Sequence, residues 1–492
     1  MTTKPVNYDA EFCGRVPLNQ TNLVQPHGVL LVIDKETNVL QASENTEDIF
    51  GAAAREVVSK SLSGFLSTKD DTLKNLLDNA SPEKQPLVLH LPSGNYPATL
   101  YGKETYFILE IEKQKIAAEL SFASVYQNVK QSVALIDAAA TTEEACRTAA
   151  VELKKLSGFD KVMIYRFDEA WNGDVVAEAK EEEMDSYLGL KFPASDVPKQ
   201  ARDLYKRSPY RFIPNVDYEP VKLYPLLNPL TNAFTDLSDS NLRSVAGVHL
   251  EYLRNMKVAA SMSTRILKDG ELWGLIACHH RTPVYLPQDM RAVFELLSAV
   301  VTAKIGAVQV DDSLAQQTQK HAQLTKLLQA FYKQEEIKPV LRMLLEADGV
   351  ATVFGSKIET EGSTPTDHEI SDLVVWLRSQ EDGAILHQPK LSAVYEPAEA
   401  YSEKASGLLA LPLQQEGNFI LAFRQEEIKR IAWGGNPQEA VQFESDGKKY
   451  HPRASFRQWQ QTVRQTANPW QNQVLQTASD VQNILSGLME GH

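Results

Sequence analysis

The sequence has few cysteines, an excess of negative charge and no long apolar run. Its three cysteines, Cys13, Cys146 and Cys278, are too few for a disulfide scaffold and fit a reducing cytoplasm. With 50 Lys and Arg against 64 Asp and Glu, the net charge is −14, which argues against a general nucleic-acid-binding surface. No uninterrupted apolar run approaches the roughly 18 residues of a membrane-spanning helix, and the first residues lack the apolar stretch of a signal peptide. We therefore expect a cytoplasmic protein that binds neither a membrane nor nucleic acid.

The composition that is present is typical of folded, soluble domains. Apolar residues make up 43 % of the chain and charged residues 23 %, which is wrong for a disordered protein. At 492 residues the chain has room for about three domains. Composition alone indicates no function.

Alternating and apolar segments predict an α+β fold with several small sheets. Residues 29–33 and 39–42 predict a hairpin in a first module, with further strands at 87–91 and 105–111. A second module begins with a helix after Thr141, followed by the strand segments 161–167, 174–178, 259–267 and 271–279, the last two joined across Asp269-Gly270. A third has a long helix over 291–332, strands at 350–354, 408–413 and 419–423, and a C-terminal apolar heptad from Val474 to Leu488.

An irregular segment over 184–240 interrupts the second module, and such an insert is usually functional. Within it, Pro193 and Pro198 bracket Ser195 and Asp196. One interpretation is a helix start, with Ser195 or Asp196 as N-cap and Pro198 in the first turn. The other is an aspartate held at a fixed angle toward a pocket, and the two interpretations are compatible.

The remaining candidates are weaker when they are read from residues alone. His249, His279 and His280 either line a ligand pocket or are satisfied core histidines, and their spacing is poor for a metal site. Cys278 lies in an apolar strand and is more typical of a buried small hydrophobe than of a nucleophile. No serine-hydrolase or phosphate-loop motif is present.

Five motifs resemble those of bacterial phytochromes, in the order PAS, GAF and PHY. They are Cys13 with Gln25–Gly28 in the arm, Phe192–Tyr205, Tyr252–Met256, Trp273–His280, and the tongue-like pair Trp433–Gly435 and Pro452–Phe456. The resemblance implies an arm and PAS domain over 1–125, a GAF domain over 126–307 and a PHY domain over 308–492. It also implies antiparallel sheets joined by long helices, with a helical spine that forms a parallel homodimer.

The resemblance further implies a linear tetrapyrrole in the GAF pocket. Many relatives attach the bilin through a cysteine just before the pocket histidine, but here Val248 precedes His249. Bacterial members use a cysteine in the arm, which Cys13 matches. The implied cofactor is therefore biliverdin IXα, joined to Cys13 as a thioether. The implied pocket residues are Met163, Tyr165, Phe192, Asp196, Val197, Tyr205, Arg211, Arg243, His249, Tyr252, Ser261, Ser263 and His279.

The implied mechanism is a light-driven switch between red- and far-red-absorbing states. Asp196 would pair with Arg453 of the tongue at rest and with Ser455 in the other state, and Trp433 belongs to the same tongue. One departure is visible, because Ala246 and Gly247 replace the serine and proline that often precede the pocket histidine.

Three hypotheses about activity follow from these motifs. The first is a bilin photoreceptor that is not itself an enzyme and controls an output domain or a response regulator. The second is the sensor half of a light-regulated histidine kinase or diguanylate cyclase. The third is a GAF-type sensor of a small ligand without a bilin.

Overall fold

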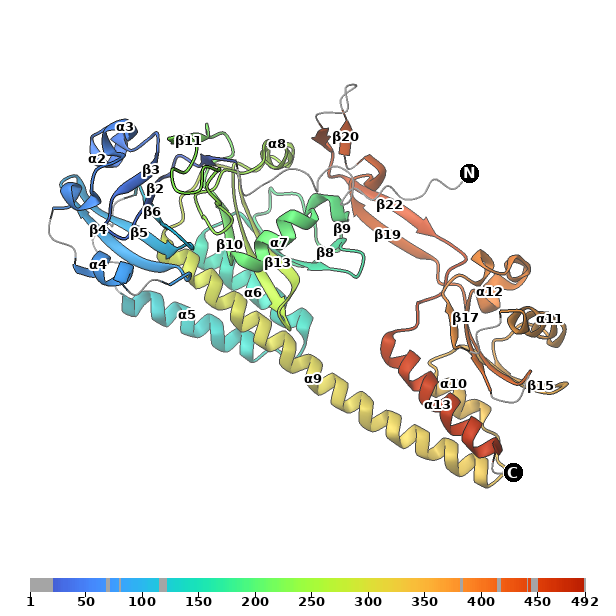
Figure 1. Cartoon of the computed structure of the whole chain (residues 1–492). Coiled ribbons are helices and arrows are strands. Elements are labelled where there is room, and N and C mark those ends of the chain that lie inside the picture. Colours follow the sequence, from blue (N-terminus) through green and yellow to red (C-terminus); the bar gives the residue numbers. More distant parts are fainter. Residues whose placement is uncertain are drawn as a thin grey trace. The chain divides into compact units, whose positions relative to one another are not determined.

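The computed structural model describes residues 21–67, 71–78, 81–114, 122–380, 384–413, 417–439, 441–443 and 450–490. They form two compact units, one of residues 1–308 with 432–459 and the other of 309–431 with 460–492 (Figure 1). Residues 432–459, which the sequence places in the third module, therefore pack as part of the first unit. Cys13 lies outside the described residues.

The PAS-like part of the first unit is a seven-stranded sheet. The predicted hairpin is confirmed, and a strand over 94–102 was not predicted. The strand order is β1 (Leu23–Val24), β11 (Val221–Tyr224), β3 (Val39–Ser43), β2 (Gly28–Ile33), β6 (Phe107–Glu112), β5 (Gly94–Gly102) and β4 (Gln85–Leu91). This part also contains the short helices α2 (Glu47–Phe50), α3 (Ala54–Val57) and α4 (Asp71–Asp78). Every residue of β2 is buried because both faces of the strand are covered.

The irregular insert supplies one strand of that sheet and holds the arm on both sides. Leu23 pairs with Lys222 of β11, and β11 in turn pairs with β3. On its other side the arm pairs Val24 with Arg243, and the amide of Gln25 donates to the carbonyl of Leu242 at 2.7 Å. The first described residues of the arm therefore lie beside Arg243.

The second sheet has eight strands and separates a helical face from a cavity face. The order is β10 (Tyr210–Ile213), β12 (Ala260–Lys268), β13 (Glu271–His280), β7 (Lys161–Phe167), β8 (Gly173–Lys180), β9 (Lys191–Phe192), β19 (Lys429–Gly434) and β22 (Gln458–Val463). Figure 1 shows α5 (Phe122–Asp137), α6 (Thr142–Ser157) and the first part of α9 (Gln288–Tyr332) together on one face, where they share one apolar core with the sheet. The helix α6 was predicted, and Thr141 caps it through its hydroxyl, but α5 was not predicted.

The opposite face of this sheet carries α7 (Lys199–Arg207) and α8 (Gly247–Asn255). The predicted side-chain N-cap of α7 is wrong. Ala194–Asp196 form a separate 3₁₀ turn, and α7 begins after Pro198, which has no capping side chain. This leaves the Asp196 side chain free to serve another purpose.

The second unit has a five-stranded sheet with two apolar cores. The order is β15 (Lys357–Gly362), β14 (Gly349–Phe354), β18 (Phe419–Arg424), β17 (Gly407–Pro412) and β16 (Leu386–Gln388). One core contains α10 (Lys338–Leu344) and α13 (Asn472–Glu490), and the other contains α11 (Asp367–Arg378) and α12 (Ser402–Ala405). Val474, Val481 and Leu485 of the predicted heptad are buried within this unit, so these apolar residues of α13 pack against the unit's own core.

One segment of α9, Gln288–Val310, is long and apolar enough to cross a membrane by length and composition alone. The sequence criterion of an uninterrupted run missed it because polar residues are scattered through the segment. The core helix of a soluble protein meets the same criterion, and here Phe294, Leu297 and Val301 are fully buried against the second sheet.

A buried ion pair joins the start of α9 to the PAS-like sheet. The Arg291 guanidinium, 1 % exposed, donates to the carboxylate of Glu112 on β6, 11 % exposed. The same guanidinium lies 5.4 Å from the ring centre of Phe212. Removing one partner of such a pair leaves a buried charge without compensation.

We therefore expect Arg291→Met to lower the free energy of unfolding by about 3–5 kcal/mol. Urea unfolding followed by tryptophan fluorescence measures the change. The matched control is Arg254→Met, whose partner Asp217 is 70 % exposed, and its cost is expected to stay below about 1 kcal/mol. An equal loss of unfolding free energy in the two variants would contradict the stabilising role of the buried Arg291–Glu112 pair.

Candidate functional site

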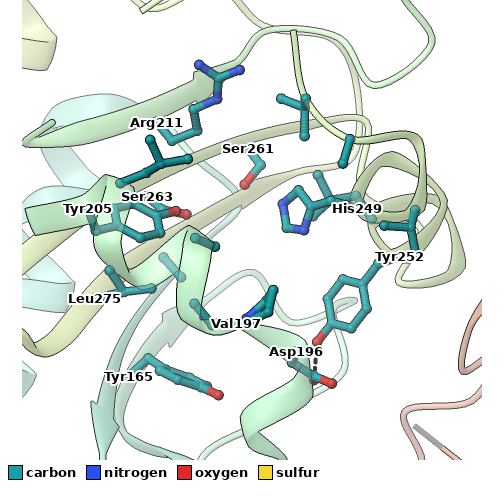
Figure 2. Close-up of a pocket in the computed structure, with 18 of the residues that line it drawn as sticks. Tyr165, Asp196, Val197, Tyr205, Arg211, His249, Tyr252, Ser261, Ser263 and Leu275 are labelled. Carbon is teal, nitrogen blue, oxygen red and sulfur yellow. Dashed lines mark hydrogen bonds between the residues drawn. The ribbon is translucent and has the colours of Figure 1, made fainter. Parts of the chain in front are cut away.

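A cavity of about 440 Å³ lies between the second sheet, α7 and α8 (Figure 2). Every predicted pocket residue in the described part of the chain lines it. These are Met163, Tyr165, Phe192, Asp196, Val197, Tyr205, Arg211, Arg243, His249, Tyr252, Ser261, Ser263 and His279. Trp433, Arg453 and Ser455 do not line it, although Pro452 of the tongue does.

Strand alternation explains which side chains reach the cavity. On β13, Leu275, Ala277 and His279 line it, while Ile276 and Cys278 point into the helical core. Neighbouring strands follow the same period of two, which brings Ser261 and Ser263 of β12 to the cavity face. Leu275 and Ala277 were not predicted, but their spacing from His279 on one strand could have indicated them.

On α7 and α8, the side chains that line the cavity are those three or four residues apart, which share one face of the helix. On α7, Ala201, Leu204 and Tyr205 share the face turned to the cavity, and on α8, His249 and Tyr252 do so. Leu204 was not predicted. The N-cap of α8 is Ala246, which has no capping side chain, so the departure noted in the sequence leaves both Ala246 and Gly247 at the cavity wall.

One end of the cavity is cationic. The Arg211 guanidinium donates to the carbonyls of Arg243 and Asn241. Burial and the neighbouring Arg211 lower the pKa of Arg243 to about 9. Two guanidiniums placed together in a pocket repel each other, so a carboxylate group entering here would relieve the repulsion. Tyr205, Ser261 and Ser263 bring hydroxyl groups to the same cavity.

Two histidines, His249 and His279, also line the cavity. His249 stacks on Tyr252 with ring centres 6.0 Å apart and an interplanar angle of 10°. Burial lowers the pKa of His249 to about 4 and that of His279 to about 3, with nearby positive charges adding to the effect. Within the described part of the chain, Nδ1 of His279 is buried and has no hydrogen-bond partner. That nitrogen is available to a ligand.

The other end carries a buried ion pair. Nη1 of Arg453 lies 3.1 Å from Oδ1 of Asp196 and Nη2 lies 2.5 Å from Oδ2, with the two side chains 3 % and 6 % exposed. The Tyr252 hydroxyl also donates to Oδ2 at 2.7 Å, as Figure 2 shows. Burial raises the pKa of Asp196, and Arg453 and Tyr252 oppose that rise. Among the described residues that line the cavity, Asp196 is the only carboxylate.

The tongue is packed closely around this pair. Arg453 lies 4.9 Å from the ring centre of Phe456 and 5.5 Å from that of Phe192. A Cβ on Gly434 would lie 2.6 Å from the Phe192 ring, and Gly435, at φ 95°, would collide with Arg453 if it carried one. Glycine is therefore required at Gly435, and a larger residue at Gly434 would displace the Phe192 ring.

The outer part of the tongue makes polar contacts, and Trp433 and Ser455 occupy different environments. The side-chain amide of Asn255 donates to the backbone carbonyl of Arg453 at 3.2 Å, and Nδ1 of His451 lies 3.0 Å from the Glu251 carboxylate. Trp433 is buried and pairs with Lys191 of β9, whereas Ser455 is exposed.

The two described cysteines do not point into the cavity. Cys146 and Cys278 are free and fully buried in the helical core. Burial raises the pKa of both thiols, to about 12 for Cys146, so neither is a nucleophile near neutral pH. The predicted structural role of both is consistent with these positions.

Comparison with known proteins gives matches along nearly the whole chain. Residues 13–114 match the PAS fold family, 141–305 the GAF domain and 307–492 the phytochrome region. The chain is 35 % identical to cyanobacterial phytochrome B of Nostoc sp., covering 99 % of this chain and 67 % of that protein. It is also 35 % identical to a bacteriophytochrome of Xanthomonas campestris, covering 94 % and 76 %. Across the cyanobacterial relatives it spans about two thirds of their length or slightly less.

Two solved structures share the fold. A bacteriophytochrome from the photosynthetic bacterium R. palustris superposes with a TM-score of 0.85 at 31 % identity, covering 98 % of this chain and 99 % of that one. The Stigmatella aurantiaca phytochrome photosensory core module gives 0.81 at 32 % identity, covering 98 % of each chain.

The buried histidines predict an acid sensitivity. Below about pH 6.5 an unfolded chain protonates its histidines, while His249 and His279 stay neutral in the folded protein. The unfolded state then binds more protons, so the free energy of unfolding falls as pH drops from 6.5 toward 4. We expect His249→Gln to reduce that slope by up to about 1.4 kcal/mol per pH unit in urea titrations. The exposed His90→Gln is the control, and an identical slope in His249→Gln would contradict the burial argument.

Proposed function

Because the chain belongs to the phytochrome family, as a PAS-GAF-PHY photosensory core, we propose that it is a red/far-red photoreceptor that binds biliverdin covalently. The observation that carries this proposal is the cavity itself, which has the guanidiniums of Arg211 and Arg243 at one end and a buried carboxylate–guanidinium pair at the other. No catalytic group is assigned to it. We infer that any kinase or cyclase activity belongs to an output domain, and that a response regulator would be a partner of such an output.

The residues present fit a bilin. The volume of about 440 Å³ is in the range of small-molecule sites. Arg211 and Arg243 would hold the two propionates, with Tyr205, Ser261 and Ser263 donating hydroxyl hydrogen bonds. His279 has a buried nitrogen without a partner, and the carbonyl of Asp196 and the His249 ring would accept from pyrrole nitrogens. When bound, the bilin supplies absorption of red light and isomerisation of the double bond that leads to its last ring.

Attachment through Cys13 is supported by two features of the chain. The residue before His249 is Val248, which has no thiol, and both described cysteines lie in the helical core. The pairing of Val24 with Arg243 places the described start of the arm at the cavity. Cys13 is eleven residues earlier (24 − 13), a span of at most about 36–40 Å, so the chain is long enough to reach the cavity.

The proposed switch is an exchange of partners at Asp196. At rest the carboxylate accepts from Arg453, and in the other state it would accept from Ser455 as the tongue refolds from strands to a helix. At rest Arg453 is buried and Ser455 is exposed. On a helix, residues two apart are separated by about 200°, so refolding would change which of the two faces Asp196. A bistable element biased by one buried group is what a switch requires.

Signal transfer is proposed along the helices. The tongue strands β19 and β22 are continuous with the second unit, and α9 runs from the second sheet into it. We propose a parallel homodimer along α9, whose residues Leu296, Val310 and Leu314 are at least half exposed. Two buried free thiols are consistent with a cytoplasmic protein.

Loading with biliverdin tests the ligand. We expect a green protein with reversible red and far-red difference spectra, and zinc-dependent fluorescence of the denatured adduct. Cys13→Ala loses that fluorescence because the thioether cannot form, whereas Cys146→Ala keeps it. A colourless wild type would favour a bilin-free sensor and contradict the proposal, and fluorescence in Cys13→Ala would place the link elsewhere.

Two substitutions with different expected effects test the exchange of partners. Asp196→Ala removes the acceptor used in both states, so the yield of the photoproduct falls. Arg453→Ala removes a contact of the resting state only and leaves the buried Asp196 carboxylate unpaired there, so thermal return slows, by roughly tenfold for each 1.4 kcal/mol of that contact formed in the transition state. Arg457 is exposed on the same tongue, and Arg457→Ala is expected to leave both the photoproduct yield and the rate of thermal return unchanged. Return at the wild-type rate in Arg453→Ala would reject the exchange.

A further inference from the structure

A buried lysine lies beside the cavity and has no role in the function proposed above. Lys161 is the first residue of β7, and its side chain is 1 % exposed. Lysine is rarely buried to this extent without partners, because removing an ammonium from water is costly. Its surroundings therefore indicate what it does.

The ammonium is held by one turn of the insert. Nζ lies 3.9 Å from the ring centre of Tyr187, donates to the carbonyl of Asp185, and lies 3.8 Å from the Glu178 carboxylate. Glu178 in turn accepts from the amide of Tyr187 at 2.9 Å and from the Ser186 hydroxyl at 2.5 Å. The lysine and the glutamate together fix the backbone and the ring of this turn.

That turn forms part of the cavity wall. Tyr187 is 6 % exposed, lines the cavity, and packs edge-on against Phe192 with ring centres 5.8 Å apart. Lys161 also lies directly opposite His279 in the register of β7 and β13, so both side chains are on the cavity face. The pKa of His279 is lowered mainly by burial, and the charge of Lys161 is the next largest cause.

We propose that Lys161 is a positioning residue of the pocket, whose ammonium holds the Tyr187 ring at the cavity wall and sets the charge beside His279. This rests on the proposed function in one respect, because the charge would also act on the spectrum of the bound bilin. A positive charge fixed near a conjugated cation changes the energy of its ground and excited states unequally. Loss of the proton from Nζ to solvent removes that charge.

The charge of Lys161 changes in an accessible pH range. Burial lowers its pKa to about 8, Glu178 and Asp185 oppose the decrease, and Lys180 adds to it. Lys161 is thus charged below about pH 8 and neutral above it. The titratable groups facing it are Glu178 and Lys180 on β8, Asp185 and Tyr187 in the turn, and His279 on β13, with His249 of α8 beyond. His280 faces the other side of β13 and pairs with Asp160.

Titration of lysine side-chain carbon signals by NMR in the bilin-free protein tests the charge without any bilin. We expect a lysine signal with a midpoint near pH 8 that is absent from Lys161→Met. The matched control Lys180→Met moves the midpoint upward, because it removes a like charge nearby. Titration of Lys161 near its ordinary value of about 10.4 would overturn the proposal.

Spectra of the biliverdin-loaded protein between about pH 7 and pH 9 test the effect on the pocket. The wild-type red band is expected to shift with the midpoint found by NMR. Lys161→Arg keeps its charge over this range and rescues the low-pH spectrum, whereas Lys161→Met shows the high-pH spectrum throughout. A band independent of pH, in protein whose Lys161 titrates near 8, overturns the proposal. A protein that takes up no bilin contradicts the proposed function instead, and the NMR titration still decides for or against Lys161.

Discussion

A carboxylate and a guanidinium that are both shielded from water, Asp196 and Arg453, constrain the rest of the structure. Neither can stay charged in that position without the other, because separating them would leave a buried charge unpaired. The pair joins positions 257 residues apart and brings the tongue to the cavity. Such a pair adds little net stability over apolar packing, but it selects one arrangement among those the chain could adopt. A switch built on it has to supply a second partner for Asp196 when Arg453 leaves.

The electrostatics of the cavity are ordered along its length. Arg211 and Arg243 make one end attractive to carboxylates, His249 and His279 offer neutral donors or acceptors, and Asp196 forms an ion pair with Arg453 at the other end. A ligand with acidic groups at one place and pyrrole nitrogens at another would therefore bind in a single orientation. Sheet alternation and two short helices are enough to build this order, since each element turns one side to the cavity.

Local signals in the sequence predicted only part of the secondary structure, and they could not show long-range pairing. The Asp269-Gly270 hairpin and the Thr141 cap were predicted because neighbouring residues determine them. The pairing of β11 with β3 joins Leu223 to Ser43, and no local pattern indicates such a partner. Most of the cavity residues came from resemblance to a family, not from periodicity. The side-chain cap expected before α7 was wrong because Asp196 is used by Arg453 instead, and the role of Lys161 depends on a turn that has no sequence signal.

We propose that release of Arg453 from Asp196 frees the tongue strands. Hydrogen exchange of backbone amides in the biliverdin-loaded protein, in darkness and under red light, tests it most directly. The amide of Gly435, which donates to the carbonyl of Arg457 at 3.0 Å, reports on the pairing of β19 with β22. We predict that illumination speeds exchange there, while the amides of β12 and β13 stay protected. Unchanged exchange at Gly435 in a protein that photoconverts fully would contradict the account.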